Sequence, residues 1–228
     1  MKTLLLFDID GTLLGAEDAT RRAISKTFRD LFSAGGAIDE ISFTGRTDPG
    51  IFQDVAGRLL KRPLRDKELA LVSERYLALL PEELRRLTSF RLMPGVKRLL
   101  SLLADTEDII LGLETGNLET AAYMKLERGG IEGYFALGGF GSDSDDRTKI
   151  VRTAIERARQ HNRETIPEEN IFLIGDSTYD IAAGRDLGVN TLAVCTGHTA
   201  PDALLAESPS CLLPDLSDTG YFLRCIGA

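Results

Sequence analysis

The stretch at residues 3–14, TLLLFDIDGTLL, constrains the fold of this 228-residue chain more than any other. Its first half is an uninterrupted apolar run, which is typical of a strand buried on both faces of a parallel sheet. In sheets of this kind, ligands collect beyond the carboxyl ends of the strands. Asp8 and Asp10 follow the run directly and, two residues apart in an extended chain, project to the same side. The stretch therefore predicts a parallel α/β sheet with two acids in one cleft.

Asp8 and Asp10 need a partner for their charges if they share a cleft. Two carboxylates in a partly desolvated site repel each other unless a cation or a shared proton intervenes. Mg²⁺ meets this need because it prefers oxygen ligands, takes one or two protein carboxylates and leaves its other positions to water and phosphate. Gly11 allows the chain to turn away after the pair. The competing interpretation is an acidic turn that merely ends the strand.

Helical periodicity replaces the strand pattern after residue 14. Apolar residues recur on one face of three stretches, Asp18–Ala34, Asp48–Leu60 and Asp66–Leu80. No strand pattern of comparable quality interrupts them. The sequence thus predicts a small helical domain at about residues 15–87, inserted into a core that comprises residues 1–14 and 88–228.

Strands and helices alternate in the remainder of the chain. An amphipathic helix opens after Met93, and further helices are predicted near residues 118–129, 148–160 and 179–187. The candidate strands are Ile109–Leu113, Ala136–Leu137, Ile171–Ile174, Thr191–Val194 and Cys211–Leu213. This alternation predicts an α/β fold with a Rossmann-like, doubly wound parallel sheet.

The composition bears on partners and location. A formal charge of −8 argues against a nucleic-acid-binding surface, which would carry a basic stripe. No apolar run approaches the ~20 residues that span a bilayer, and no signal-peptide pattern begins the chain, so we expect a cytoplasmic protein with no membrane partner. Cys195, Cys211 and Cys225 form no Cys-x-x-Cys pair, and we interpret them as small buried apolar residues rather than as a disulfide framework or a zinc site. His161 and His198 are too few for a metal cluster or a Ser-His triad.

Three further places along the chain carry polar groups next to a predicted strand or helix. Thr115, Gly116 and Asn117 follow one strand, where a hydroxyl and the backbone N–H groups of a helix start can bind an anion, although Thr115 alone is more typical of a helix N-cap. Residues 141–149 form an acidic run closed by two cations, a pattern otherwise typical of a solvated surface. The apolar run at Ile171–Ile174 leads into two acids four residues apart, which in isolation fit an ordinary helix start.

Together these features resemble the four motifs of the haloacid dehalogenase (HAD) superfamily, in the family order. Asp-Ile-Asp-Gly-Thr-Leu at residues 8–13 resembles the first motif, and Thr115 resembles the second. Cations at the start of a helix stand where the third motif has a Lys or Arg, without the Lys-Pro pair of the commoner pattern. Gly-Asp-Ser-Thr-Tyr-Asp at residues 175–180 matches the fourth. The predicted helical insertion resembles the family's cap, as in the phosphoglycolate phosphatase and β-phosphoglucomutase group.

The resemblance implies a Mg²⁺-dependent phosphatase that acts on a small phosphate ester. Asp8 would attack phosphorus to give an aspartyl-phosphate, and Asp10 would protonate the leaving oxygen and then activate water. Mg²⁺ would lie between Asp8, the backbone carbonyl of Asp10 and Asp176, with Asp180 joining it or orienting a metal-bound water. Because dehalogenases and phosphonatases lack an acid at the place of Asp10, both are poor matches.

The resemblance also implies the groups that hold the phosphate. Thr115, Gly116 and Asn117 would bind it together with the cation of the third motif, which neutralises the transferring group. We favour Arg147 for that cation by its spacing to the following helix, with Lys149 as the close alternative. Arg grips two oxygens in a planar fork, where Lys supplies a point charge.

Three questions stay open in the sequence. A phosphomutase would use the same residues, and a non-catalytic phosphate-binding regulatory module would keep the fold without turnover. Arg46, in a polar loop between two predicted cap helices, is the hypothetical contact to the polar end of the substrate, although an exposed loop Arg is nearly as good an interpretation. We expect a monomer or a weak dimer.

Overall fold

Six parallel strands form the central sheet of the computed structural model, which describes residues 2–163 and 165–228. The strands are β1 (Thr3–Phe7), β4 (Ile109–Glu114), β5 (Gly138–Gly139), β6 (Ile171–Gly175), β7 (Asn190–Val194) and β8 (Cys211–Leu213). Their order is β5-β4-β1-β6-β7-β8, so β1 lies between β4 and β6. The predicted parallel α/β sheet is confirmed, and the carboxyl ends of β1, β4 and β6 are neighbours.

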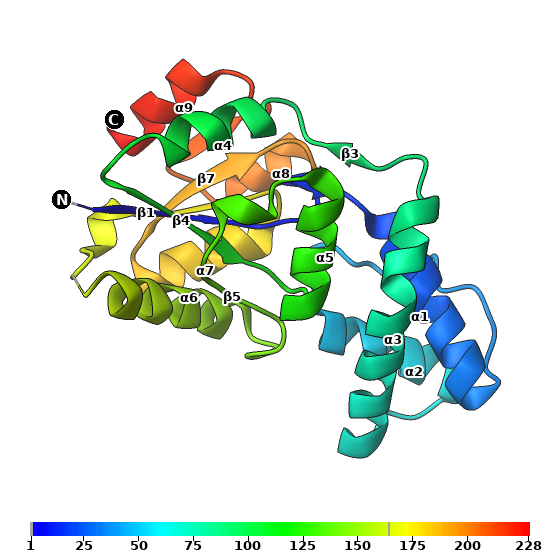
Figure 1. Ribbon diagram of the computed structural model, residues 1–228. Helices are drawn as coiled ribbons and strands as arrows, with labels where there is room; N and C mark the ends of the chain where they lie inside the picture. Colours follow the sequence, from blue (N-terminus) through cyan, green and yellow to red (C-terminus); the bar gives the residue numbers. More distant parts are fainter. Residues whose placement is uncertain (1, 164) are drawn as a thin grey trace.

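Strand β1 is apolar from Leu4 to Phe7, and helices cover both faces of the sheet there. Leu5 and Phe7 belong to the core cluster that includes residues of α4 (Val96–Ala104) and α9 (Thr219–Ile226). Leu4 and Leu6, which point to the opposite face, pack in a second cluster with α6 (Arg147–Asn162). Figure 1 shows α4 and α9 on one side of the sheet and α6 and α7 (Thr178–Leu187) on the other. Burial of each such side chain contributes roughly 1.5–3 kcal/mol, which explains the uninterrupted run.

Three helices lie together beyond one end of the sheet (Figure 1). They are α1 (Glu17–Phe32), α2 (Asp48–Leu60) and α3 (Asp66–Arg86). Glu83 of α3 is buried and binds α1 through Arg22, whose Nε donates at 2.8 Å, and through Lys26. Helix α3 continues beyond the predicted end at Leu80, through Pro81. Leu80 and Leu84 are both buried, so packing on either side of the proline holds the helix together despite the missing N–H.

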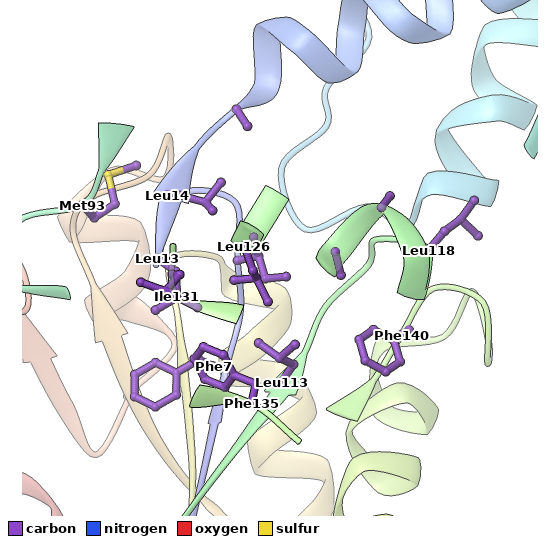
Figure 2. Packing of buried hydrophobic residues seen from close by; sticks show 14 of the residues in the cluster. Phe7, Leu13, Leu14, Met93, Leu113, Leu118, Leu126, Ile131, Phe135 and Phe140 are labelled. Atoms are coloured by element: carbon purple, nitrogen blue, oxygen red, sulfur yellow. The ribbon is translucent and has the colours of Figure 1, made fainter. Parts of the chain in front are cut away.

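A two-stranded antiparallel ribbon, β2 (Leu14–Gly15) and β3 (Arg91–Leu92), brackets these three helices. The sequence pattern did not predict it, because two residues carry no periodicity. Helix α5 (Glu119–Gly129) lies between the three helices and the sheet. Figure 2 shows the side chain of Leu126 in α5 close to Leu13 and Ile131, above Phe7 and Leu113.

One strand at the sheet edge differs in position from the prediction. The strand predicted at Ala136–Leu137 lies at Gly138–Gly139, where it pairs with the end of β4. Glycine has a low strand propensity and so hid the strand from the pattern. It is required here, since a Cβ on Gly139 would lie 2.0 Å from the carbonyl oxygen of Ile150 in α6. The other unpredicted elements are α8 (Pro201–Ala206), α9 and the 3₁₀ turns Glu132–Tyr134 and Glu168–Asn170.

The interpretation of the cysteines was wrong for two of the three. Cys211 in β8 and Cys225 in α9 form a disulfide with a Cα–Cα distance of 6.2 Å. Cys195 is free and half-buried. The pairing depends on α9 folding back beside β8, and spacing in the sequence does not reveal that contact.

Candidate active site

A cavity of about 380 Å³ opens between the carboxyl edge of the sheet and the three-helix segment. Its lining comes from loops that follow β1, β4 and β6 and from the segment around α1 and α2. The predicted site residues that line it are Asp8, Asp10, Arg46, Thr115, Gly116, Asn117, Arg147 and Asp176. Folding therefore gathers residues that are up to 168 positions apart in the sequence around one space. Asp180 lies directly behind this lining, and Lys149 lies outside it.

Three buried acids, Asp8, Asp176 and Asp180, form what we call the acidic cluster. Each offers a carboxylate oxygen, and these oxygens all lie within 4.8 Å of one another. Asp8 follows β1 and Asp176 follows the neighbouring β6, and the Asp8 backbone N–H donates to the carbonyl of Ile174 at 2.9 Å. Burial raises the pKa of Asp8 to about 6 and that of Asp176 to about 8, and the Asp8 charge adds to the second effect.

Two glycines, Gly11 and Gly197, lie directly against the carboxylate of Asp176. A Cβ on Gly11, whose φ is +91°, would lie 2.5 Å from Asp176 Oδ2, and one on Gly197 would lie 1.6 Å from it. On a third side Thr12 Oγ1 donates to Asp176 Oδ1 at 3.1 Å. The two glycines thus allow the backbone to approach a carboxylate closely, as an ion-binding site requires. The role of Gly197 was not predicted from the sequence.

Arg147 is the cation at the acidic cluster. Its Nη2 lies 3.1 Å from Asp8 Oδ1 and 2.5 Å from Asp180 Oδ1, and its Nε lies 2.9 Å from Glu114 Oε2. The first residue of α6 is buried, whereas Lys149 on the same turn is exposed, so of the two predicted cations only Arg147 enters the cavity. Asp180 also caps α7, since its Oδ2 accepts from the Ser177 backbone and hydroxyl.

Glu114, the last residue of β4, was not assigned a role from the sequence. Its side chain is completely buried beside Arg147. Burial raises its pKa well above the ordinary range, and the charges of Asp180 and Asp8 add to this against the opposing effect of Arg147. Burial therefore disfavours the charged form of Glu114, whereas the neighbouring guanidinium favours it.

Asp10 is bound by two residues on the other side of the cavity, and we call Asp10, Asn117 and Lys125 the lysine side. Asp10 Oδ2 accepts from Lys125 Nζ at 2.5 Å and from Asn117 Nδ2 at 2.8 Å. Lys125 is 1% exposed and also donates to Asn117 Oδ1 at 2.5 Å. Lys125 was not predicted, although one signal existed. It lies on the buried stripe of α5 with Ala121, Ala122 and Leu126, where an apolar residue is the rule.

In the loop after β4, Thr115 is hydrogen-bonded to Asn117, and Gly116 lies against the backbone of Arg46. The buried hydroxyl of Thr115 accepts from Asn117 through the backbone N–H at 3.3 Å and through Nδ2 at 2.8 Å. Helix α5 begins at Glu119, and its N-cap residue is Leu118, so Thr115 is not the N-cap. Gly116 lies against the Arg46 backbone, since a Cβ there would lie 2.2 Å from the Arg46 carbonyl oxygen.

Asp48, at the start of α2, links the three-helix segment to this loop. Its backbone N–H donates to the carbonyl of Gly116 at 2.7 Å, and its side chain accepts from the Leu118 N–H at 2.8 Å. Burial raises the pKa of Asp48 to about 6, against the opposing charge of Lys125. No pattern in the sequence indicates this contact, because Asp48 and Leu118 are 70 residues apart.

Arg46 lines the cavity from the loop before α2, as the hypothesis required. Its Nη2 lies 2.5 Å from Asp54 Oδ2 in α2, and both side chains are partly exposed. His198 and Glu17 also line the cavity, with His198 Nε2 at 2.8 Å from Glu17 Oε2. These groups make the outer part of the cavity polar and charged.

Among residues 2–163 and 165–228, no helix combines the length and the apolar character that crossing a membrane requires.

A parallel sheet with acids at adjacent carboxyl ends and a helical segment over them defines a hydrolase class, and comparison with known families agrees. A family model described as Haloacid dehalogenase-like hydrolase matches residues 5–194. The chain therefore belongs to the haloacid dehalogenase-like hydrolase family, and the resemblance seen in the motifs is confirmed.

Individual relatives are distant but cover the chain well. "Probable phosphatase IndB" of Dickeya dadantii (strain 3937) is 26% identical over 226 residues, which is 96% of this chain and 92% of that protein. "Phosphoglycolate phosphatase" of Synechococcus elongatus is 26% identical over 132 residues, 58% of this chain and 59% of that protein. The crystal structure of CbbY from Rhodobacter sphaeroides in complex with phosphate superposes with a TM-score of 0.76 at 19% identity, covering 96% of this chain and 97% of that one. The last similarity establishes the fold.

Proposed function

We propose that this protein is a Mg²⁺-dependent phosphomonoester hydrolase that acts through an aspartyl-phosphate on a small phosphorylated metabolite. The observation that carries the proposal is the position of Asp8, which lines the cavity within the acidic cluster and 3.1 Å from Arg147. A phosphoryl group approaching a carboxylate needs this combination, because its own negative oxygens must be neutralised for the attack to succeed. The names of two of its relatives, the phosphatases of Dickeya dadantii and Synechococcus elongatus, support it.

The acidic cluster fits Mg²⁺ as its resident ion. Three carboxylates lie within 4.8 Å, and the raised pKa values of Asp8 and Asp176 show that their charges lack sufficient compensation from the protein. Asp8, the backbone carbonyl of Asp10 and Asp176 would hold the ion, and Asp180 would orient its water. When bound, Mg²⁺ neutralises charge on the transferring phosphoryl group.

The phosphate would be held by Arg147 and by the loop after β4. Thr115 offers its hydroxyl, and Gly116 and Asn117 offer the polar groups of a loop that leads into α5. Arg147 adds two planar donors while it stays bound to Asp180. Lys149 is left out of the proposal, because its side chain is exposed and does not line the cavity.

The hydrolysis proceeds in two steps, phosphoryl transfer to Asp8 and then attack of water on the aspartyl-phosphate. An oxygen of Asp8 forms a bond to phosphorus while the bond to the ester oxygen breaks, and Asp10 gives that leaving oxygen its proton. In the second step Asp10 takes a proton from water as the water oxygen bonds to phosphorus. The bond from phosphorus to Asp8 then breaks, so that inorganic phosphate leaves and both aspartates return to their starting state.

Residues 15–87 form the cap in this proposal, and residues 1–14 and 88–228 form the catalytic core. Arg46 contacts the polar end of the substrate from the cap. Arg46→Ala is expected to raise KM about tenfold with a smaller change in kcat, because it removes ground-state binding. Arg29→Ala, which changes an exposed arginine of α1 outside the cavity, is the matched control. An unchanged KM for every hydrolysed substrate would remove Arg46 from the site.

A substrate panel tests the function directly. Purified protein is incubated with p-nitrophenyl phosphate, 2-phosphoglycolate and a set of sugar phosphates, with Mg²⁺ or with EDTA, and released phosphate is measured. We expect Mg²⁺-dependent release from at least one alkyl phosphate, lost in Asp8→Asn. The absence of turnover, combined with phosphate-ester binding by calorimetry, would instead indicate a non-catalytic binding module.

The same panel separates hydrolysis from mutase activity. A mutase would convert a sugar 1-phosphate into its isomer, whereas a hydrolase releases inorganic phosphate from it. We expect inorganic phosphate, followed by phosphorus NMR of the reaction mixture. Accumulation of the isomer would overturn the hydrolase assignment while leaving Asp8 as the nucleophile.

A further inference from the structure

Lys125 is a buried cation whose contacts are directed to one proposed catalytic residue. It is 1% exposed within α5, and its Nζ lies 2.5 Å from Asp10 Oδ2 and 2.5 Å from Asn117 Oδ1. An ammonium group removed from water is costly unless ionic partners and hydrogen bonds compensate it. Asp10 is 115 residues away in the sequence. The chain thus buries a charge in a helix stripe that otherwise carries Ala and Leu, and it directs that charge to Asp10.

The two oxygens of Asp10 have different surroundings. Oδ2 accepts from Lys125 and, at 2.8 Å, from Asn117 Nδ2. Oδ1 is covered and has no hydrogen-bond partner among the residues that the structure describes. Two N–H donors thus converge on Oδ2, one from Lys125 and one from Asn117. The carboxyl group is therefore fixed in orientation, and its two oxygens are distinguished.

Asn117 joins this arrangement to the phosphate-binding loop. Its amide donates to Asp10 and to the Thr115 hydroxyl, at 2.8 Å in each case, while its carbonyl accepts from Lys125. Lys125, Asn117 and Asp10 thus form a closed triangle in which each member contacts the other two. Such a network holds a side chain more narrowly than a single hydrogen bond does.

We propose that Lys125 is a positioning residue for the proton exchange at Asp10. By binding Oδ2 it holds the carboxyl group of Asp10 in one orientation at the cavity, where Asp10 gives the proton to the leaving oxygen in the first step and receives one from water in the second. The ammonium group transfers no proton itself. This inference rests on the proposed function, since it assigns Lys125 to the acid and base steps of that reaction. It adds a residue of α5 to a site whose other members lie in the loops after the strands, in the loop before α2 and in the first turns of α6 and α7.

A purely structural role for Lys125 makes a different prediction. If the residue only supported the packing of α5 or balanced buried charge, its loss would lower the activity toward all substrates by the same factor. A positioning role makes the loss depend on the leaving group. An alkyl oxygen needs a proton as it departs, whereas p-nitrophenolate is a stable anion that departs without one.

The experiment compares kcat/KM for p-nitrophenyl phosphate with that for the best alkyl phosphate of the panel. In Lys125→Met, which is one atom shorter and removes the donors, we expect kcat/KM for the alkyl ester to fall about 100-fold and that for the aryl ester about fivefold. Lys125→Arg, which retains the charge, should recover part of the alkyl activity. Lys97→Met, at an exposed lysine of α4, should leave both values unchanged.

A second readout follows the water step. Both esters give the same aspartyl-phosphate, and water attack on it also needs Asp10. In Lys125→Met this step becomes slower than the release of p-nitrophenol, so stopped-flow measurement should show a burst of about one p-nitrophenol per protein molecule. Leu126→Ala, which disturbs the packing of α5 without touching Asp10, should lower both esters alike and give no burst.

The outcomes separate this inference from the proposed function. Equal losses for the two esters in Lys125→Met, without a burst, would assign Lys125 a structural role and overturn the inference while the hydrolase stands. Unchanged values for both esters would also overturn it. A wild-type protein that releases no phosphate from any ester would overturn the proposed function itself. If Lys125→Met does not fold, as judged by thermal unfolding, Lys125→Gln keeps one donor at the same site and is measured in the same way.

Discussion

The acidic cluster and the lysine side face the same cavity, but they balance their charges differently. Together with Glu114, the acidic cluster comprises four carboxyl groups, and those of Asp8, Asp180 and Glu114 contact the guanidinium of Arg147. On the lysine side, Lys125 contacts the carboxylate of Asp10, and its charge also acts on the buried Asp48. The acidic cluster therefore has more carboxyl groups than its one cation can balance, whereas the lysine side has a charge balance closer to neutral.

The difference indicates which region is complete without an added ion. Burial raises the pKa of Asp8 to about 6 and that of Asp176 to about 8, so full ionisation of the acidic cluster at neutral pH requires more positive charge than Arg147 supplies. Asp10 already has a protein cation at 2.5 Å. We therefore expect changes in the acidic cluster to act through the metal and phosphoryl transfer, and changes on the lysine side to act through proton transfer.

Asp8→Asn is expected to have the largest effect. The amide cannot form the acyl-phosphate, so kcat should fall at least about 10⁴-fold for every ester. The variant should fold, because the substitution conserves shape and removes one of several crowded acids. Steady-state kinetics, with circular dichroism as the control for folding, measure this. Substantial remaining turnover would break the assignment of the acidic cluster to phosphoryl transfer.

Mg²⁺ should stabilise the protein through the acidic cluster. At a thousandfold excess over its Kd, one bound ion adds about 4 kcal/mol to the free energy of unfolding. Calorimetric unfolding with Mg²⁺ and with EDTA measures the shift without reference to activity. The shift should shrink strongly in Asp176→Asn and persist in Asp145→Asn, an exposed acid outside the cavity. An equal shift in both variants would place the ion elsewhere.

Asp48→Asn tests the cost of a buried acid near the lysine side. Burial raises the pKa of Asp48 from 3.8 to about 6, so the folded state binds this proton more tightly than the unfolded state does. Below about pH 4 Asp48 is protonated in both states and does not change the free energy of unfolding. As pH rises through 6, ionisation of Asp48 lowers the free energy of unfolding by at most about 3 kcal/mol. Asn escapes this penalty and can still accept from the Leu118 N–H.

The measurement for Asp48 is urea unfolding of wild type and variant at several pH values. The free energy of unfolding of the variant, relative to wild type, should increase between pH 4 and pH 7, whereas the exposed control Asp202→Asn should give a flat difference. A difference for Asp48→Asn that does not change with pH would show that the carboxylate remains hydrated in the folded protein.

Glu114→Gln should have the smallest effect. Burial raises the pKa of Glu114 and so favours its neutral form, and an amide of the same shape should then change kcat/KM by no more than about threefold. Asp180→Asn, at the neighbouring partner of Arg147, should cost more because it replaces a charge-assisted hydrogen bond. Parallel kinetics of the two variants give the comparison. A larger loss in Glu114→Gln than in Asp180→Asn would mean that Glu114 is ionised and helps to hold Arg147.

Some features were readable in the sequence because each leaves a local signal. The run before Asp8 predicted a doubly buried strand, and Figure 2 shows Phe7 at its end packed among core side chains. The apolar strand before Asp176 gave the second acid in the same way. The helices of the segment at residues 15–87 were visible from periodicity, apart from the turn that continues beyond Pro81. An apolar pattern and an adjacent acid suffice for such predictions, since parallel strands align their carboxyl ends.

The sequence by itself determined the parallel sheet, the acids at its edge and the family to which the chain belongs. Tertiary structure decided that Arg147 rather than Lys149 enters the cavity, that Lys125 binds Asp10 and that Asp48 contacts the loop after β4. These contacts join residues far apart in the chain and depend on how each helix is rotated about its axis. Periodicity identifies the buried stripe of a helix, but only packing determines which charge on that stripe meets which acid.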